Sequence, residues 1–405
     1  MSQTPSHVRT TEPLATQTRP VIVVLLVDDQ PIVGHAVQKM LQPESDIQFH
    51  FCKEPLQAVE MANRLSPTVI LQDLVMPDID GLTLLKFFRA NSATAQTPMI
   101  VLSSKEEPAT KAQAFGLGAN DYLVKLPDRV ELVARIRHHS YGYIAQLQRN
   151  EAYRKLAESE RQLAEEMAQA AKYVRSLLPA PLTGEPVQVA WRFVPSTQLG
   201  GDAFGYHWLD DDRFAFFLLD VSGHGVGSAL MAVSVLTTLT GKTLPRTDFA
   251  DPAAVMAGLN SVFDMARHGG HYFTIWYGVF DRTTRSLTYS GGGHPPALLL
   301  ASAEGGPAGV SELACEGPPI GMTSDLSFTN SRVVLPPKAR LLLYSDGAVE
   351  IQLPDGETAD YGAFTTFSSE PALWDHIMDA VLDRARRLRG GDVLTDDCSL
   401  VTLDF

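Results

Sequence analysis

Acidic, hydroxyl and lysine side chains follow the apolar segments in the N-terminal part of the sequence. Asp28 and Asp29 come directly after VIVVLLV, Asp73 ends TVILQD, Ser103 ends PMIVLS, and Lys125 follows DYLV. One aspartate at such a place is usually a turn or helix-cap residue, and one lysine is usually solvated. The whole series, each member at the end of an apolar segment, instead indicates one site. Three converging carboxylates repel one another unless a divalent cation neutralises them, and a hard oxygen cluster suits Mg²⁺.

Asp73 has the properties of a nucleophile in this first set. Its carboxylate would attack a phosphoryl group held beside Mg²⁺, while Lys125 pairs with the developing charge. The Ser103 hydroxyl would then reach the new phosphate oxygens. The sequence therefore predicts that Asp73 accepts a phosphoryl group.

A second set of aspartates stands beside glycine, or in a pair, in the rest of the chain. The set comprises Asp202 in GGD, Asp220 in DVSGHG, Asp346 in SDG, and the pair Asp396 and Asp397. Each alone most often marks a turn. Carboxylates without a His/Cys ligand set favour Mn²⁺ or Mg²⁺ over zinc. Two such ions would hold and acidify a bridging water and clamp the phosphate that it attacks.

The elements that must position the first set alternate between apolar, strand-like segments and amphipathic, helix-like ones over residues 21–141. This alternation predicts an α/β doubly wound domain with a parallel sheet covered on both faces. In such a sheet the functional crevice lies at the carboxyl ends of the strands, which is where the first set falls.

A long helix is expected from Glu131 to Leu178, because this stretch has neither proline nor a cluster of turn residues. Apolar positions recur every seven residues in it, which is the pattern of a coiled coil. The two interleaved series are Leu156, Leu163, Ala170 and Leu177, and Tyr153, Glu160, Met167 and Val174. We expect a helical coiled-coil linker over residues 142–178 and a homodimer through it. The alternative is a stripe that packs on the helix's own domain.

Consecutive strand-like segments dominate residues 179–405, with helical segments at VGSALMAVSVLTTL and WDHIMDAVLDRARRL. The strand-like segments are VQVAWRFV, RFAFFLLDV, YFTIWYGVF, RSLTYSG, ARLLLYSD and CSLVTLDF. This order predicts an α+β domain built on antiparallel sheet.

The composition excludes several classes of protein. A formal net charge of -14 without a Lys/Arg run argues against nucleic acid as a partner. No apolar segment reaches the ~20 residues that span a bilayer, so no membrane association is expected. Three scattered cysteines suit a reducing compartment. We expect a cytoplasmic protein with a disordered lead at residues 1–20.

The segments LLVDDQ, LQDLVMPDIDG, VLSS and GANDYLVKLP resemble the receiver domain of CheY-like response regulators. The resemblance implies strand order 2-1-3-4-5, Asp73 as phosphoacceptor and a cognate histidine kinase as partner. It also assigns roles to five further positions: Asp29 as a direct Mg²⁺ ligand, Asp28 as an outer acidic partner, the Val75 carbonyl as a backbone ligand, and Ser103 with Tyr122 as a switch pair. Leu126 departs from the family, which usually has proline directly after the lysine, so the peptide geometry there stays open.

The segments SLLP, GGD, DVSGHG, GHPP, PPIGM, LLLYSDGAVE and DDCSLVTL resemble PPM-type metal-dependent Ser/Thr phosphatases of the SpoIIE and RsbU branch. The resemblance implies an αββα sandwich. It also implies a set of ligands for two Mn²⁺ or Mg²⁺ ions: Asp220 as the bridging ligand, the Val221 carbonyl beside it, Asp202 near the first ion, Asp346 and Asp396 on the second, and Asp397 as a weaker candidate. His224 is either an acid for the leaving group or structural, and His294 is interpreted as structural.

Together these resemblances predict a two-component response regulator whose output domain dephosphorylates phosphoserine or phosphothreonine on a partner protein. By family analogy the partner is an anti-sigma-factor antagonist. The competing hypothesis is a catalytically weak phosphatase-fold scaffold that binds a regulator in a phosphorylation-dependent way. A cyclic-dinucleotide synthase is a third class, suggested by the receiver segment, but nothing resembling its GG(D/E)EF loop follows the linker.

Overall fold

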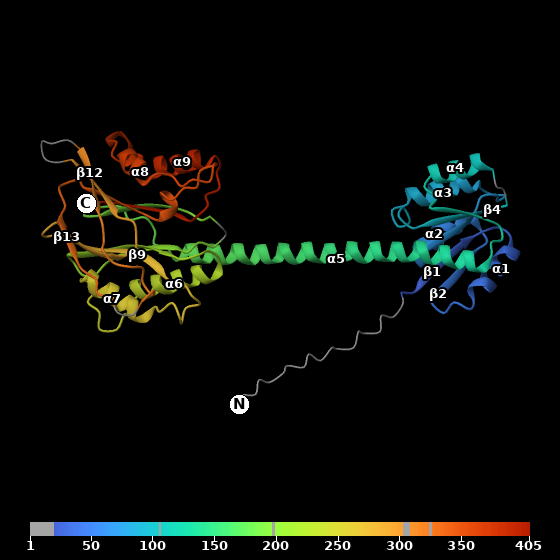
Figure 1. The fold of residues 1–405 in the computed structure, drawn as a ribbon, viewed down its shortest axis with the longest axis horizontal. Helices are drawn as coiled ribbons and strands as arrows, with labels where there is room; N and C mark the ends of the chain where they lie inside the picture. Colours follow the sequence, from blue (N-terminus) through green and yellow to red (C-terminus); the bar gives the residue numbers. More distant parts are fainter. Residues whose placement is uncertain (1–19, 105–106, 197–198, 303–307, 324–325) are drawn as a thin grey trace, which may run out of the picture. The chain divides into compact units, whose positions relative to one another are not determined.

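The computed structural model describes residues 20–104, 107–196, 199–302, 308–323 and 326–405 (Figure 1). The chain divides into two compact units, one up to Glu160 and one from Arg161 to Phe405. All but the last residue of the predicted lead at 1–20 lie outside the described residues. Within the described part, no helix is both long and apolar enough to cross a membrane.

The first unit contains a five-stranded parallel sheet of order β2-β1-β3-β4-β5, as predicted. Its strands are β1 (Ile22–Val27), β2 (Ile47–Cys52), β3 (Val69–Asp73), β4 (Met99–Ser103) and β5 (Asp121–Val124). The three central strands β1, β3 and β4 are almost entirely buried, which is why they appear in the sequence as unbroken apolar segments.

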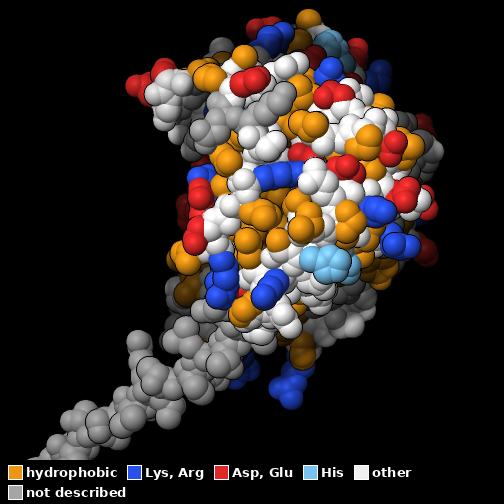
Figure 2. All heavy atoms as spheres, turned by 90° about the vertical axis from the view of Figure 1, so that its right-hand side faces the viewer, with side chains coloured by type: hydrophobic (Ala, Val, Ile, Leu, Met, Phe, Trp, Pro, Cys, Tyr) orange, Lys and Arg blue, Asp and Glu red, His pale blue; other side chains and the backbone are white. Residues whose placement is uncertain are grey.

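Helices cover both faces of this sheet. They are α1 (Pro31–Leu41), η1 (Pro55–Gln57) with α2 (Ala58–Leu65), α3 (Gly81–Ala90), α4 (Pro108–Gly116) and the first turns of α5 (Arg129–Ser176). Val37 of α1 and Ile136 of α5 belong to the core on one face, and Ala62, Phe88 and Ala114 belong to the core on the other. The first unit is therefore the doubly wound α/β domain that the sequence predicts. On the face drawn in Figure 2, apolar side chains and side chains of both charges are interspersed.

The helix α5 runs without interruption for 48 residues, from Arg129 to Ser176. It begins and ends within two residues of the predicted bounds. Leu132, Val133, Ile136 and Ser140 near its start are buried, whereas its seven-residue apolar series is largely exposed in the single chain. The coiled coil stays a prediction. Leu177, the last member of one series, follows the end of the helix and packs on the core of the second unit.

The second unit contains two five-stranded sheets in which every pairing between strands is antiparallel, as predicted. The first sheet, β13-β10-β9-β8-β7, has the strands β7 (Asp202–Trp208), β8 (Arg213–Val221), β9 (Phe273–Asp281), β10 (Ser286–Gly292) and β13 (Ser331–Val334). The second sheet, β12-β11-β14-β15-β6, has the strands β6 (Gln188–Val194), β11 (Ala297–Ser302), β12 (Ala308–Leu313), β14 (Arg340–Tyr344) and β15 (Cys398–Asp404).

The two sheets pack face to face between two layers of helices. Phe216 and Trp276 of the first sheet meet Leu343 and Leu403 of the second in the core between the sheets. Helices α6 (Val226–Thr240) and α7 (Pro252–Val262) cover the outer face of the first sheet. Helices α8 (Tyr361–Ser368) and α9 (Ile377–Arg389), with η3 (Pro371–His376), cover the outer face of the second (Figure 1). The layers thus follow the predicted αββα order.

Candidate phosphoacceptor and metal sites

The first site lies at the carboxyl ends of β1, β3 and β5. The Lys125 ammonium contacts Asp28 Oδ2 at 2.8 Å and Asp73 Oδ2 at 2.7 Å. Asp28 and Asp73 are buried. Burial raises the pKa of Asp28 even though Lys125 donates a hydrogen bond to it. Burial also opposes the charge of Lys125, but its hydrogen bonds to the two carboxylates outweigh this effect and raise its pKa. Lys125 therefore holds the two carboxylates together as a cation.

Asp29 completes a group that suits a divalent cation. Asp28, Asp29 and Asp73 each offer a carboxylate oxygen within 4.8 Å of the others. Within the described part of the chain, Asp29 Oδ1 is buried and has no hydrogen-bond partner. A buried, unpartnered carboxylate oxygen is costly unless a cation or donor satisfies it. An all-oxygen donor set with few protein ligands fits Mg²⁺, which keeps several waters.

The structure places the remaining residues predicted for the first site on β4, on β5 and in the loop after β3. Ser103 is buried at the end of β4, and Tyr122 is buried in β5 with Lys111 Nζ 5.1 Å from its ring centre. Val75, whose carbonyl is the predicted backbone ligand, is exposed. The peptide between Lys125 and Leu126 is cis, although the second residue is not proline. This finding answers the question that Leu126 leaves open in the sequence.

The second site begins with Asp202 and Asp220, which are paired opposite each other in β7 and β8. Within the described chain, both carboxylate oxygens of Asp202 are buried without a hydrogen-bond partner. The hydroxyls of Ser345 and Ser399 are nevertheless near enough to favour its charged form. Burial, and then the charge of Asp220, raise the pKa of Asp202 well above its ordinary value. Such a carboxylate requires a cation or a proton.

Asp346 and Asp396 approach the same place from the second sheet. Asp346 begins η2 (Asp346–Ala348) directly after β14, and Asp396 lies just before β15. Burial, and then the charges of Asp346 and Asp396, raise the pKa of Asp220 to about 8. Burial, and then Asp396 and Glu350, raise the pKa of Asp346 to about 6. The charges of Asp220, Asp346 and Asp396 thus act on other carboxylates of the set, so the structure groups the four predicted residues.

The four carboxylates are less tightly grouped than those of the first site. Within the described residues, Asp28, Asp29 and Asp73 are the group whose oxygens approach within 4.8 Å of one another, and the second set does not reach this closeness. The donor set and the unpartnered oxygens of Asp202 still fit Mn²⁺ or Mg²⁺. Val221 is buried at the end of β8, next to Asp220.

Asp397, the weaker candidate, has a different role. Its Oδ1 accepts hydrogen bonds from the backbone N–H and the hydroxyl of Ser196, at 2.8 and 3.0 Å, and its Oδ2 accepts one from the N–H of Gly201 at 2.6 Å. Both carboxylate oxygens of Asp397 thus accept hydrogen bonds from the loop before β7. The sequence gives no signal that separates Asp396 from Asp397 in this respect.

The glycines of the aspartate motifs are required because other segments of the chain approach them closely. A Cβ on Gly200 would lie 2.6 Å from Asp397 Oδ2, and one on Gly201 would lie 2.7 Å from the Val221 carbonyl oxygen. A Cβ on Gly347 would collide with the backbone of Asp397. Only glycine allows these segments to approach closely enough to group the carboxylates.

The histidines also separate by environment. His294 is buried, its Nδ1 is 2.8 Å from Thr274 Oγ1, and burial lowers its pKa to about 3. Thr274 is the strand partner of Asp220. His224 is exposed in the loop before α6. His271, which sequence reasoning missed, has its Nδ1 2.9 Å from the Ser222 carbonyl oxygen, and its lone position before β9 offers no sequence signal.

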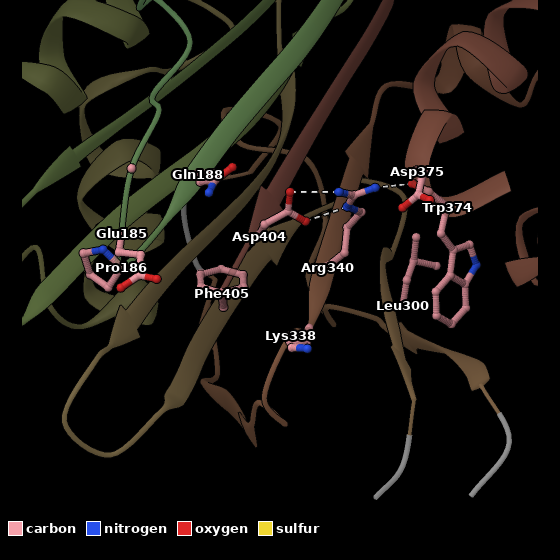
Figure 3. Close-up of a pocket in the computed structure, with 12 residues that line it drawn as sticks. Glu185, Pro186, Gln188, Leu300, Lys338, Arg340, Trp374, Asp375, Asp404 and Phe405 are labelled. Atoms are coloured by element: carbon pink, nitrogen blue, oxygen red, sulfur yellow. Dashed lines mark hydrogen bonds and ion pairs between the residues drawn. The ribbon is translucent and has the colours of Figure 1, made fainter. Parts of the chain in front are cut away.

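Two cavities of the second unit differ in their relation to this site. One, of about 570 Å³, is lined by Asp346, Thr274 and His294 among others, so it opens beside the carboxylates. The other, of about 410 Å³, contains none of the predicted site residues (Figure 3). There Arg340 binds both oxygens of Asp404 and donates to the Trp374 carbonyl, so its guanidinium is already occupied (Figure 3).

Comparisons with known proteins agree with this division. Residues 24–137 match the family model for the response regulator receiver domain, and residues 210–405 match the model for stage II sporulation protein E (SpoIIE). The phosphoserine phosphatase RsbP of Bacillus subtilis is 34% identical over 190 residues, which cover 46% of this chain and 45% of that protein. The DNA-binding dual master transcriptional regulator RpaA of Synechocystis sp. is 32% identical over 115 residues, which cover 28% of this chain and 47% of that protein. These matches span less than half of either relative.

A solved structure supports the fold of the second unit. The SiaA-PP2C domain of Pseudomonas aeruginosa aligns with a TM-score of 0.52 and 20% identity, over 62% of this chain and 99% of that chain. At this identity the likeness shows the fold alone. The fold and the family matches identify a receiver domain joined to a phosphatase-type domain. The chain carries a response regulator receiver domain followed by a PPM-type phosphatase domain of the SpoIIE family.

Proposed function

We propose that this chain is a response regulator that is phosphorylated on Asp73 and that dephosphorylates phosphoserine or phosphothreonine on a partner protein. The observation that carries the proposal is the grouping of Asp202 and Asp220 on β7 and β8 with Asp346 and Asp396 beside β14 and β15. Neighbouring carboxylates there raise the pKa of Asp202, Asp220 and Asp346. A protein that only binds a partner has no use for a buried carboxylate such as Asp202, whose oxygens have no hydrogen-bond partner within the described chain.

At the receiver site, Asp73 would accept the phosphoryl group from a cognate histidine kinase. Lys125 already contacts Asp73 and would pair with the added negative charge. Asp28, Asp29, Asp73 and the Val75 carbonyl would hold Mg²⁺. Ser103 and Tyr122 would form the switch pair that responds to the phosphoryl group.

At the phosphatase site, Asp202, Asp220, Asp346, Asp396 and the Val221 carbonyl would hold two Mn²⁺ or Mg²⁺ ions. When bound, such ions supply acidification of a bridging water and neutralisation of the phosphate charge. The chain's own contribution is to fix the carboxylates through β7, β8 and the starts of η2 and β15. His294 is unsuited to proton donation, because burial keeps it neutral.

The substrate class follows from resemblance. RsbP, which is 34% identical over 190 residues of this chain, is a phosphoserine phosphatase. By the same family analogy, the partner would be an anti-sigma-factor antagonist.

A phosphatase-fold scaffold is the second candidate, and one observation favours it. The phosphatase carboxylates are less tightly grouped than those of the receiver. Incubation of the purified chain with p-nitrophenyl phosphate and Mn²⁺ separates the two. The proposal predicts turnover that excess EDTA abolishes, whereas a scaffold would show none under either condition.

A further inference from the structure

The cavity of about 570 Å³ opens beside Asp346, one of the proposed ion ligands. Besides Asp346, Thr274 and His294, it is lined by Gly293, Pro295, Pro296, Val349, Glu350, Thr358, Ala359 and Tyr361. Its size is in the range of ligand-binding pockets. Because a candidate ion ligand forms part of its wall, a substrate whose phosphate reaches the carboxylates would place its neighbouring residues here.

One wall of the cavity is a hydrogen-bonded hairpin. The Ala359 N–H donates to the Ile351 carbonyl at 2.9 Å, and the Leu353 N–H donates to the Glu357 carbonyl at 2.8 Å. The Tyr361 hydroxyl lies 3.0 Å from the Tyr344 hydroxyl, which fixes the tyrosine that follows the hairpin. The cavity is therefore formed before any ligand enters, and binding would cost little ordering of this wall.

The charges around the cavity have one sign. Asp346 and Glu350 line it, and no lysine or arginine does so among the residues whose placement is described. Glu350 is exposed and forms no ion pair within the described chain. Bound ions would neutralise Asp346 but leave Glu350 charged. The other lining side chains are uncharged, since burial keeps His294 neutral. An acidic side chain in the cavity would be repelled, and a basic one would be attracted.

We propose that this cavity is a specificity subsite that receives the residues next to the phosphorylated side chain, and that Glu350 selects a lysine or arginine there. The inference rests on the proposed phosphatase function and names the substrate segment that the site accepts. The long aliphatic stem of a basic side chain would lie along Pro295, Pro296 and Val349, while its charged end meets Glu350.

The test uses two phosphoserine peptides that differ only in carrying lysine or glutamate at the two positions on each side of the phosphoserine. With Mn²⁺, the full chain should have a kcat/KM for the lysine peptide that is higher by roughly fivefold or more, mainly through KM. Glu350→Gln should bring the ratio of the two values close to one, and Glu350→Lys should invert it. Glu370→Gln, which removes an exposed charge outside the cavity, should leave the ratio as it is.

Three outcomes would overturn the subsite. They are an equal or higher kcat/KM for the glutamate peptide, a ratio that the Glu350 substitutions do not change, and a ratio that Glu370→Gln changes as much as Glu350→Gln does. p-Nitrophenyl phosphate, which has no flanking residues, separates this failure from failure of the proposed function. If the unsubstituted chain hydrolyses neither peptide nor p-nitrophenyl phosphate, the phosphatase function itself is wrong and the subsite falls with it. If it hydrolyses p-nitrophenyl phosphate, any of the three outcomes counts against the subsite alone.

Discussion

The buried charges of the two sites are compensated differently, as Lys125 and Asp202 show. Lys125 compensates two carboxylates through contacts of 2.8 and 2.7 Å, so the receiver site is partly neutralised by the chain itself. Asp202 has no such cation, and its environment raises its pKa. We therefore expect turnover at the phosphatase site to depend more strongly on added divalent ions than the stability of the receiver fold does.

Asp73 should accept phosphate from acetyl phosphate in the presence of Mg²⁺, since it is the buried carboxylate at the end of the middle strand. Asp73→Asn should abolish the acid-labile phosphate, measured by intact-protein mass spectrometry. Asp78→Asn, which changes an exposed aspartate of the following loop, is the matched control and should be labelled normally. Labelling that persists in Asp73→Asn would show that the phosphoacceptor is another residue.

Removing a proposed ion ligand should stop turnover without unfolding the protein. We expect Asp220→Ala and Asp346→Ala each to lower the Mn²⁺-dependent rate on p-nitrophenyl phosphate by at least about 100-fold. Both should fold, because each substitution removes a charge from a group of carboxylates that repel one another. Asp211→Ala, in an exposed loop, serves as the control. Retained activity with a normal circular dichroism spectrum would refute the ligand assignment.

Gly347 allows a close approach that no other residue would permit. A Cβ at this position would collide with the backbone of Asp397, so Gly347→Ala must displace η2 or the segment before β15. We expect a loss of about 1–3 kcal/mol in the free energy of unfolding, measured by urea denaturation, together with a loss of turnover. Gly391→Ala adds the same methyl group in open space and should change neither quantity. Equal stability of the two variants would contradict this explanation of the SDG motif.

Most of the strands expected from the sequence are those whose burial gives a continuous apolar segment. β11 (Ala297–Ser302) is an exception, because this internal strand is equally apolar and buried but is not among the expected segments. RFAFFLLDV matches β8 (Arg213–Val221) residue for residue, because both faces of this central strand are buried. β7 was missed as a strand, since Gly205 interrupts its pattern. The structure gives the reason for this glycine: a Cβ there would lie 2.5 Å from the Phe217 ring.

The other missed elements lie toward the edges of the sheets or in the outer layers. β12 and β13 are edge strands with few apolar residues, so alternation alone does not reveal them. The sequence does contain helix-start signals for α7 and α8. Asp251 before Pro252, and Asp360 before Tyr361, accept hydrogen bonds from the first turns of these helices as N-caps. The grouping of the aspartates could be predicted from their motifs and from the strands that precede them. The hydrogen bonds of Asp397 to Ser196 and Gly201 could not, because these residues are distant from it in sequence.

The exposed apolar series of α5 is the part of the chain that is predicted to pair with a second copy. Tyr153, Leu156 and Leu163 are 65%, 55% and 57% exposed in the single chain. Burial against a second copy would stabilise a dimer. We expect Leu156→Glu combined with Leu163→Glu to abolish the dimer while leaving phosphorylation of Asp73 intact, as measured by light scattering and mass spectrometry. Gln162→Glu with Gln169→Glu adds the same charge beside the series. If this control dissociates the protein equally, net charge and not the apolar series is responsible.

The whole molecule combines a receiver unit with a phosphatase-type unit, and the helix α5 contains the sequence that joins them. A helix without a break can transmit a change in one domain as a rigid shift. If phosphorylation favours a paired state of α5, mass action makes oligomerisation and activity rise together with protein concentration. We therefore predict that phosphorylation of Asp73 sets the rate of the phosphatase site.

The most direct test measures phosphatase turnover and light scattering on the same samples, with and without acetyl phosphate, at fixed Mg²⁺ and Mn²⁺. For the unsubstituted chain, we predict that acetyl phosphate raises both the dimer fraction and the rate on a phosphoserine peptide. For Asp73→Asn, we predict that it changes neither. A chain that is fully stimulated while it stays monomeric would refute pairing as the switch. An identical response of the unsubstituted chain and Asp73→Asn would contradict the claim that the receiver controls the phosphatase.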